Sequence, residues 1–94
     1  MRQEGAQNVV TISLCMIVKN EERTLARCLD TVTDLVDEII ILDTGSSDRT
    51  MDIAAKYTDR VYTYTWNEDF AAARNESFVR ATQEYILWLD ADDS

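Results

Sequence analysis

The chain has 94 residues, which is enough for one small domain. Its 18 acidic and 9 basic residues give a net charge of −9, and this balance argues against a nucleic-acid partner, because phosphate backbones are bound through Lys and Arg. Histidine is absent, so a metal site would have to use oxygen ligands, which favours Mg, Mn or Ca over Zn or Cu.

The N-terminal residues and the two cysteines give no targeting or redox signal. Residues 1–8 are polar and lack the apolar core of a signal peptide, and we interpret residues 1–10 as a lead-in. No apolar run approaches the ~20 residues that span a bilayer, so no membrane span is expected. Cys15 and Cys28 lie in apolar stretches without C-x-x-C spacing, which predicts two buried thiols in a reducing compartment, the cytoplasm.

The first predicted element is a strand over residues 11–18, apolar on both parities near its end, as expected for a strand covered on both faces. Asn20 is predicted to cap the helix that follows, with Glu21 in its first turn to complement the helix dipole. The apolar stripe of that helix starts at Leu25 and repeats with three-and-four spacing.

A second strand is predicted over residues 38–42, a β-branched run of the fully buried kind. It ends at Asp43, and Gly45 then permits a tight turn or the close approach of a ligand. Ser46 or Ser47 is predicted to cap the next helix, whose N-terminus would attract anions.

The third strand, predicted over residues 60–66, alternates Thr with aromatic side chains, which indicates two different faces and an edge position. Polar residues 67–69 follow it, and then a helix over residues 70–81. The spacing places Arg74 near the buried side of this helix, where an arginine requires an anionic partner.

The last predicted strand, residues 85–89, reads as buried and ends abruptly in carboxylates. Ionised acids cannot lie unpaired in a core, so Asp90 and Asp92 must follow the strand where it leaves the sheet. Only Ala91 separates them, so on an extended chain both side chains point to the same side. Two such carboxylates suit a hard divalent cation, Mn, Mg or Ca, that also binds phosphate.

These elements predict a Rossmann-like β-α-β-α-β-α-β fold of the α/β class with a parallel sheet and right-handed crossovers. Each strand ends in polar residues, and the ends of parallel strands share one edge. The sequence therefore predicts an acidic, hydroxyl-rich crevice that binds a nucleotide with a divalent cation.

Four segments together resemble the family 2 glycosyltransferases of the GT-A fold, in particular the bacterial branch whose catalytic domain is often joined to helical repeats. They are ISLCMIVKNEERTLARCLDTV, DEIIILDTGSSDRT, DFAAARNES and YILWLDADD. The resemblance runs from about Thr11 to Ser94, and the order and spacing of the segments make it specific.

The resemblance implies roles for individual residues. Residues 18–21 would lie along the nucleobase and ribose, Asp43 would bind the base, usually uracil, and Arg74 would line the nucleotide-sugar pocket. In the family's Asp-x-Asp motif, Asp90 would hold the ribose or sugar and Asp92 the metal that bridges the diphosphate. The predicted substrate-binding residues are Val18, Lys19, Asn20, Glu21, Asp43, Gly45, Ser46, Asp48, Arg74, Asp90 and Ala91, with Asp92 as the metal ligand.

The implied activity is metal-dependent, inverting transfer of a sugar from a nucleoside diphosphate donor, UDP, to an acceptor that the sequence does not identify. The catalytic base of the family is expected beyond Ser94, so no residue here is assigned that role, and residues 11–94 are interpreted as the N-terminal half of the domain. We expect this half to be inactive alone, and to self-associate into homo-oligomers through an open sheet edge near residues 85–89.

Three other readings remain open on the residues alone. A nucleotidyltransferase would use a similar metal site, but with a glycine- and basic-rich loop after the first strand, and residues 18–21 contain no glycine. A phospho-accepting receiver domain would need an acid pair after the first strand and an acceptor Asp after the third, which residues 67–69 imitate only loosely. A non-catalytic nucleotide-binding module fits because donor binding is all that this half could perform.

Overall fold

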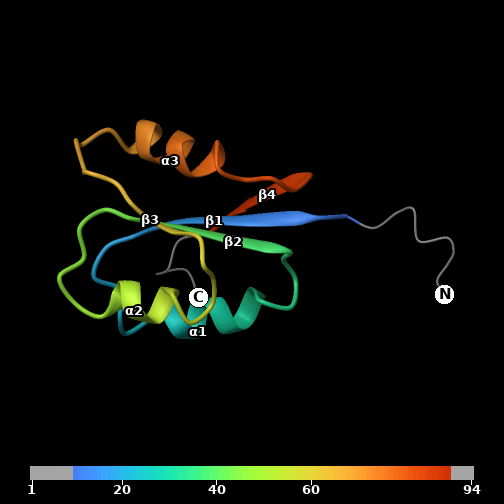
Figure 1. Ribbon diagram of the computed structural model, residues 1–94, viewed down its shortest axis with the longest axis horizontal. Helices are drawn as coiled ribbons and strands as arrows, with labels where there is room; N and C mark the ends of the chain where they lie inside the picture. The colour runs from blue at the N-terminus through green and yellow to red at the C-terminus, as the bar shows by residue number, and fades with distance from the viewer. Residues whose placement is uncertain (1–9, 90–94) are drawn as a thin grey trace, which may run out of the picture.

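A computed structural model of the chain describes residues 10–89, in which four parallel strands form one sheet in the order β3-β2-β1-β4 (Figure 1). The elements are β1 (Ile12–Val18), α1 (Leu25–Val32), β2 (Glu38–Asp43), α2 (Thr50–Ala54), β3 (Val61–Thr63), α3 (Phe70–Phe78) and β4 (Tyr85–Trp88). The α/β fold with a parallel sheet is thus confirmed, as is the edge position of the third strand. No helix within the described range is long and apolar enough to cross a membrane.

The helices form layers on both faces of the sheet, with α1 and α2 on one side and α3 on the other (Figure 1). Alternate side chains of the two central strands point to opposite layers. The core beneath α1 and α2 consists of Leu14, Met16, Val18, Leu25, Cys28, Leu29, Ile39, Ile41 and Ala54. Burying each of the larger side chains contributes roughly 1.5–3 kcal/mol, which makes this layer the main source of stability.

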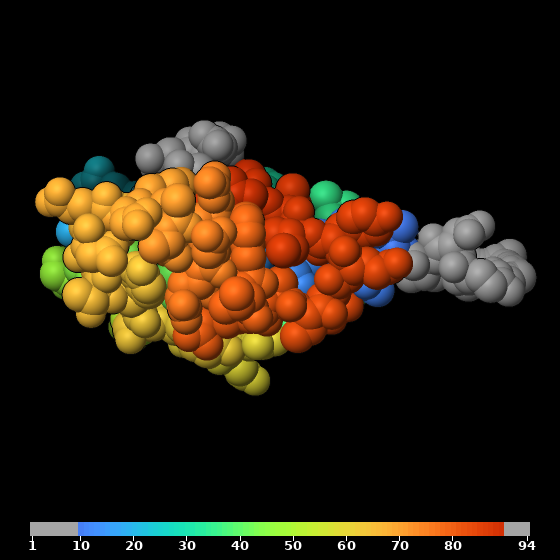
Figure 2. Space-filling view, turned by 90° about the horizontal axis from the view of Figure 1, so that it is seen from above, coloured from blue at the N-terminus to red at the C-terminus, as the bar shows by residue number. Residues whose placement is uncertain are grey.

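Helix α3 approaches the other face closely because it presents small residues to the sheet. Ala73 and Ser77 are its buried side chains, and the Cys15 thiol of β1 donates to the Ser77 carbonyl oxygen at 3.6 Å. Figure 2 looks onto this side and shows α3 in orange beside β4 in red. Cys15 and Cys28 are both buried free thiols, as predicted, and burial raises the pKa of Cys15 to about 11.

Strand β4 is less buried than its sequence predicts. Tyr85 is 58% and Ile86 43% exposed, because β4 pairs only with β1 and has no strand on its outer edge within residues 10–89. The apolar sequence is that of a strand with two neighbours, whereas one is present in the described chain. The apolar run therefore predicted the strand correctly and its burial wrongly.

The predicted helix starts are also corrected. Asn20 is not a helix cap: its φ of 53° is left-handed, a conformation that Asn tolerates well, and α1 begins only at Leu25 after Thr24. Neither Ser46 nor Ser47 caps α2, which begins at Thr50. These short polar side chains form hydrogen bonds between the two loops instead of capping the helices.

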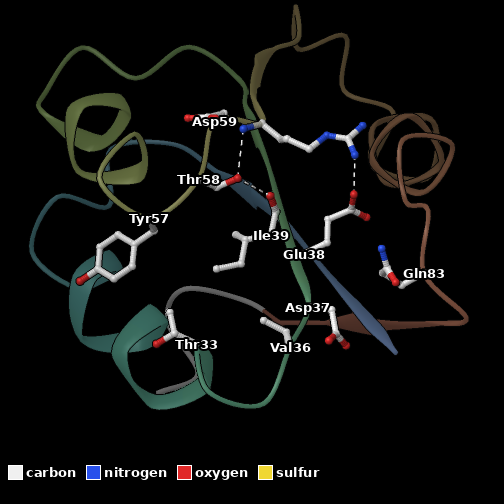
Figure 3. Close-up of a pocket in the computed structure, with 10 residues that line it drawn as sticks. Thr33, Val36, Asp37, Glu38, Ile39, Tyr57, Thr58, Asp59 and Gln83 are labelled. Atoms are coloured by element: carbon white, nitrogen blue, oxygen red, sulfur yellow. Dashed lines mark hydrogen bonds and ion pairs between the residues drawn. The ribbon is translucent and has the colours of Figure 1, made fainter. Parts of the chain in front are cut away.

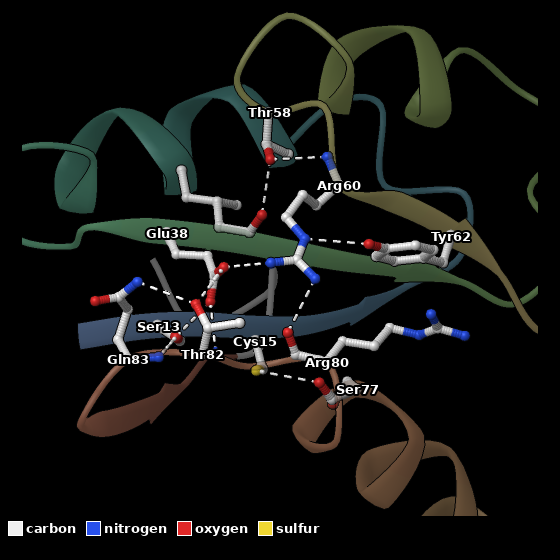
Figure 4. Close-up of polar contacts among 11 residues, drawn as sticks. Ser13, Cys15, Glu38, Thr58, Arg60, Tyr62, Ser77, Arg80, Thr82 and Gln83 are labelled. Atoms are coloured by element: carbon white, nitrogen blue, oxygen red, sulfur yellow. Dashed lines mark hydrogen bonds and ion pairs between the residues drawn. The ribbon is translucent and has the colours of Figure 1, made fainter. Parts of the chain in front are cut away.

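At the amino end of the sheet, a polar network centred on Glu38 ties the strands together (Figure 4). The Glu38 carboxylate accepts from the Ser13 hydroxyl at 2.6 Å and from the Thr82 amide and hydroxyl at 2.9 Å each, and it pairs with Arg60. Burial alone would raise the pKa of Glu38, but the Ser13 and Thr82 hydrogen bonds and the Arg60 charge together lower it. The network thereby joins β1, β2, the start of β3 and the segment before β4.

Candidate functional site

The carboxyl ends of β1, β2 and β3 lie level with one another. Val18 is in register with Asp43, and Asp43 with Thr63, so the loops that follow the three strands meet at one edge, on the left of Figure 1. The predicted common edge is therefore present for these strands. The remaining predicted site residues, Asp90, Ala91 and Asp92, lie outside the described residues.

Hydrogen bonds join the loops after β1 and β2 into one unit. The Asn20 amide donates to Ser46 Oγ at 2.8 Å, and Asn20 Oδ1 accepts from the Ser47 amide at 2.8 Å. One residue further, the Glu21 amide donates to Thr50 Oγ1 at 2.7 Å. The predicted residues Asn20 and Glu21 thus position the loop after β2 through their backbone and amide groups.

Asp48 completes this connection from the start of α2. Its Oδ1 accepts from the Thr50 hydroxyl and, at 2.9 Å, from the Thr50 amide, while its Oδ2 accepts from the Glu22 amide at 3.3 Å. The hydrogen bond from the Thr50 hydroxyl is the main reason that the pKa of Asp48 is lowered. Both oxygens of Asp48 are therefore engaged within the protein.

Asp43 differs from Asp48 because one of its buried oxygens is unpaired. The residue is 1% exposed, and its Oδ1 accepts from the Gly45 and Ser46 amides at 2.8 Å each. Gly45 has a φ of 122°, which an L side chain rarely adopts, so this turn requires glycine. Asp43 Oδ2 is buried and has no hydrogen-bond partner in the described structure. A buried carboxylate oxygen is costly to leave unpaired, so it favours a ligand that donates a hydrogen.

Two adjoining cavities open at this edge and share Thr44 and Trp66. The larger, of about 520 Å³, is lined by Asp43, Thr44, Gly45, Ser46, Met51, Thr63, Tyr64, Thr65 and Trp66. The smaller, of about 290 Å³, is lined by Ile17, Val18, Lys19, Glu21, Thr44, Trp66 and Phe70. Six of the predicted site residues therefore line one or the other of these neighbouring cavities. Two more, Asn20 and Asp48, form hydrogen bonds between the loops after β1 and β2.

Arg74 does not lie on the buried side of α3, as the spacing predicted. It is exposed, because Ala73 and Ser77 take the positions that face the sheet. Its guanidinium carbon lies 5.8 Å from the centre of the Phe70 ring, and Phe70 lines the smaller cavity. Arg74 is therefore connected to the site through an aromatic neighbour.

The sequence analysis did not identify Thr44, Trp66 or Phe70 as residues that line the site. Thr44 donates from both its amide and its hydroxyl to the Val18 carbonyl oxygen, at 3.0 and 3.3 Å, which joins the ends of β1 and β2. Trp66 and Phe70 pack edge to face, 6.4 Å apart between ring centres. The available signal was an aromatic residue at each end of the polar stretch that follows the third strand.

A third cavity, of about 450 Å³, lies at the opposite edge beside the Glu38 network (Figure 3). Several of its polar side chains are already paired: the Thr58 hydroxyl donates to the Ile39 carbonyl oxygen at 2.7 Å, and Arg60 pairs with Glu38. None of its lining residues has a buried side-chain nitrogen or oxygen without a partner in the described structure. The carboxyl edge is therefore the better candidate for a ligand site.

Residues 10–89 hold no group of three or more Asp, Glu or Cys side chains placed to bind a metal ion. The predicted metal ligand, Asp92, lies beyond that range, so the metal site stays a prediction.

Comparisons with known proteins agree with this arrangement. The glycosyl transferase family 2 model matches residues 13–94. A TPR repeat-containing protein of Synechococcus elongatus is 51% identical over 82 residues, covering 87% of this chain and 20% of the relative. The SPbeta prophage-derived glycosyltransferase SunS of Bacillus subtilis is 41% identical over 85 residues, covering 88% and 20%. The chain thus spans about a fifth of the length of these curated relatives.

Solved structures of Mycobacterium tuberculosis glucosyl-3-phosphoglycerate synthase share the fold. The complex with UDP has a TM-score of 0.77 at 28% identity over 95% of this chain and 36% of that one. The complex with Mn²⁺ and UDP-glucose has a TM-score of 0.74 at 29% identity, with the same coverage. With a family match over nearly the whole sequence, the chain belongs to glycosyltransferase family 2.

Proposed function

We propose that this chain binds the nucleotide-sugar donor, with UDP as its nucleotide, as part of a metal-dependent inverting glycosyltransferase whose acceptor is unassigned. Family membership and the UDP complexes of the structural neighbours support the proposal. The nucleotide would occupy the two cavities at the carboxyl edge, the usual ligand position in parallel α/β sheets.

The observation that carries the proposal is the bonding state of Asp43. Its Oδ1 already accepts two amide hydrogens, which leaves only Oδ2 for a base. Uracil offers a single donor, N3–H, and needs one oxygen. Guanine offers N1–H and N2–H side by side and pairs best with both oxygens of a free carboxylate. The Asp43 carboxylate therefore favours uracil over guanine.

The metal and diphosphate contacts extend the proposal to Asp90, Ala91 and Asp92. Structural neighbours were crystallised with Mn²⁺ or Mg²⁺ together with UDP or UDP-glucose. The carboxylate of Asp92 is a hard oxygen ligand suited to either ion. When bound, the cation would supply positive charge to the leaving diphosphate. Lys19, which lines the smaller cavity, and exposed Arg74 would provide additional positive charge for the donor.

We further propose that the chain alone binds the donor without transferring the sugar. No carboxylate within residues 10–89 is assigned as the general base that inverting transfer requires. Two free buried thiols support a cytoplasmic setting for the protein. If the 94-residue chain alone released UDP and produced a glycosylated acceptor, the proposal that it does not transfer the sugar would be contradicted.

Calorimetric titration with UDP, with and without Mn²⁺, tests the donor site. Asp43→Asn should weaken UDP binding in both conditions, whereas Asp92→Ala should remove only the increment that Mn²⁺ adds. GDP should bind wild type more weakly than UDP does. Asp52→Ala, an exposed substitution on α2, is the matched control and should bind like wild type. Unchanged UDP affinity in both site variants would refute the proposal.

A further inference from the structure

Trp66 is the aromatic residue that the two cavities of the carboxyl edge have in common. It is 40% exposed, although it is a large apolar side chain. Of the large apolar side chains exposed in the described chain, only Trp66 and Phe70 line these cavities. Exposed aromatic surface beside a cavity is more typical of a ligand contact than of an ordinary surface position.

Trp66 is held in place from both its backbone and its ring. Two residues before it, the Tyr64 amide donates to the Asp43 carbonyl oxygen at 2.8 Å, which fixes the segment beside the unpaired carboxylate. Its ring meets Phe70 edge to face, and Phe70 meets Trp88 of β4 in the same way, at 5.9 Å and 90°. An aromatic side chain supported in this manner loses little freedom when a planar group stacks on it.

The turn after Trp66 fixes the direction in which the chain leaves. Glu68 has a φ of 64°, and the Asp69 amide donates to Asn67 Oδ1 at 3.1 Å. Asp69 then caps α3 by accepting from the Ala72 amide at 3.0 Å. The segment that carries Trp66 is thus anchored to β2 on one side and to a capped helix on the other.

We infer that Trp66 is the surface on which the nucleobase stacks while the edge of the base donates to Asp43 Oδ2. The inference rests on the proposed function, because it concerns the same ligand. A planar base presents an edge and two faces, and one cavity is lined by both an aspartate, which could accept from the edge, and a tryptophan, which could stack on a face. Stacking tolerates any base, so Trp66 sets the affinity for the nucleotide and Asp43 selects which base is bound.

The first test measures binding of UDP by calorimetry. Trp66→Ala should bind UDP about tenfold more weakly than wild type, and Trp66→Phe should recover most of that loss because a ring is restored. Val79→Ala, which removes an exposed apolar side chain remote from both cavity linings, is the matched control and should bind like wild type. Circular dichroism of each variant verifies that the fold is retained.

The second test separates stacking from hydrogen bonding. The 5,6-dihydrouridine analogue of UDP keeps N3–H but has a puckered, non-aromatic ring. Wild type should bind this analogue about tenfold more weakly than UDP, and Trp66→Ala should bind the two ligands equally. Asp43→Asn should still discriminate between them, because it retains the indole.

The third test uses the two tryptophans of the chain as probes. UDP should quench the fluorescence of wild type and of Trp88→Phe, and this quenching should be absent in Trp66→Phe. If Trp66→Ala binds UDP as tightly as wild type while Asp43→Asn binds it weakly, the inference is overturned and the proposed function stands. If wild type does not bind UDP at all, both the inference about Trp66 and the proposed function are overturned.

Discussion

The two edges of the sheet carry polar clusters of similar chemistry that differ in how their carboxylates are paired. At the amino edge, Glu38 accepts hydrogen bonds from Ser13 and Thr82 and pairs with Arg60 (Figure 4). At the carboxyl edge, Asp43 is buried more deeply than the partly buried Glu38, yet it keeps one oxygen without a partner in the described structure. Each edge also contains a cavity of comparable size, about 450 and 520 Å³.

The comparison shows that neither a buried acid nor a cavity by itself marks a ligand site in this molecule. What distinguishes the carboxyl edge is a carboxylate oxygen that has no partner within residues 10–89, beside an exposed aromatic side chain. The amino edge has one unpaired buried atom, Arg80 Nε, but that guanidinium lies 4.0 Å from the Tyr62 ring centre and does not line the cavity there. Substitutions at the two edges should therefore have opposite consequences for stability and binding.

The largest expected effect is on the stability of the amino edge. Glu38→Ala removes an acceptor used by three hydrogen bonds and takes away the carboxylate that pairs with Arg60, so the free energy of unfolding should fall by about 3 kcal/mol. Urea denaturation measures this, with exposed Glu84→Ala as the matched control, for which little change is expected. Glu38→Gln keeps an acceptor oxygen and should lose less. A loss below about 1 kcal/mol in Glu38→Ala would mean that the network is not structural.

At the carboxyl edge the pattern should reverse. Asp43→Asn retains an oxygen for the Gly45 and Ser46 amides and removes a buried charge, so the unfolding free energy should change by less than about 1 kcal/mol in either direction. UDP binding should weaken by about 2 kcal/mol, because the side-chain NH2 group of the new asparagine would face the N3–H group of uracil, and neither can accept a hydrogen bond. If Asp43→Asn destabilised the fold as much as Glu38→Ala, the contrast between the two edges would disappear.

Low pH should destabilise the fold mainly through Glu38 at the amino edge and Asp48 between the loops after β1 and β2. The pKa values of Glu38 and Asp48 are lowered in the folded state, so the unfolded chain binds protons more readily. The stability that these groups contribute is complete above their ordinary values, 4.5 and 3.8, and is lost as the pH falls through the lower folded values. Urea denaturation between pH 7 and pH 3 should show this loss, and Glu38→Gln should lose less between these limits. An equal pH dependence in both proteins would exclude Glu38 as a source.

The sequence predicted the sheet better than it predicted the loops. A short β-branched run such as residues 38–42 strongly favours a strand, and the polar ends of parallel strands gather where the strands leave the sheet. Asn20 and Ser46 were assigned to helix caps because capping and loop bonding use the same short polar side chains. Only the three-dimensional approach of the two loops decides between these roles, and that approach is not encoded locally.

Asp43 was predictable as a candidate site residue, whereas the aromatic side chains beside it were not. Asp43 ends a buried strand, and the polar residues at the ends of all four predicted strands, together with the family resemblance, made it a candidate. Trp66 is polar-flanked and resembles an exposed strand residue, so its place between two cavities depends on how the segment after β3 folds back beside β2. Arg74 was assigned to the buried face because residues three apart are neighbours on a helix surface, and Arg74 lies three residues before the buried Ser77.

The smallest expected effect concerns the outer edge of β4, where the predicted self-association remains a proposal. Tyr85 and Ile86 are exposed there, on a strand that pairs only with β1 in the described chain. An open apolar edge favours pairing with a second copy, but four residues form a small contact, so the association should be weak and concentration-dependent. Light scattering should show mass rising with concentration, and Ile86→Lys should reduce the rise while Leu35→Lys, an exposed residue away from β4, should not. A constant monomer mass at every concentration would show that the edge is not adhesive, and the comparison of edges would then rest on Glu38 and Asp43 alone.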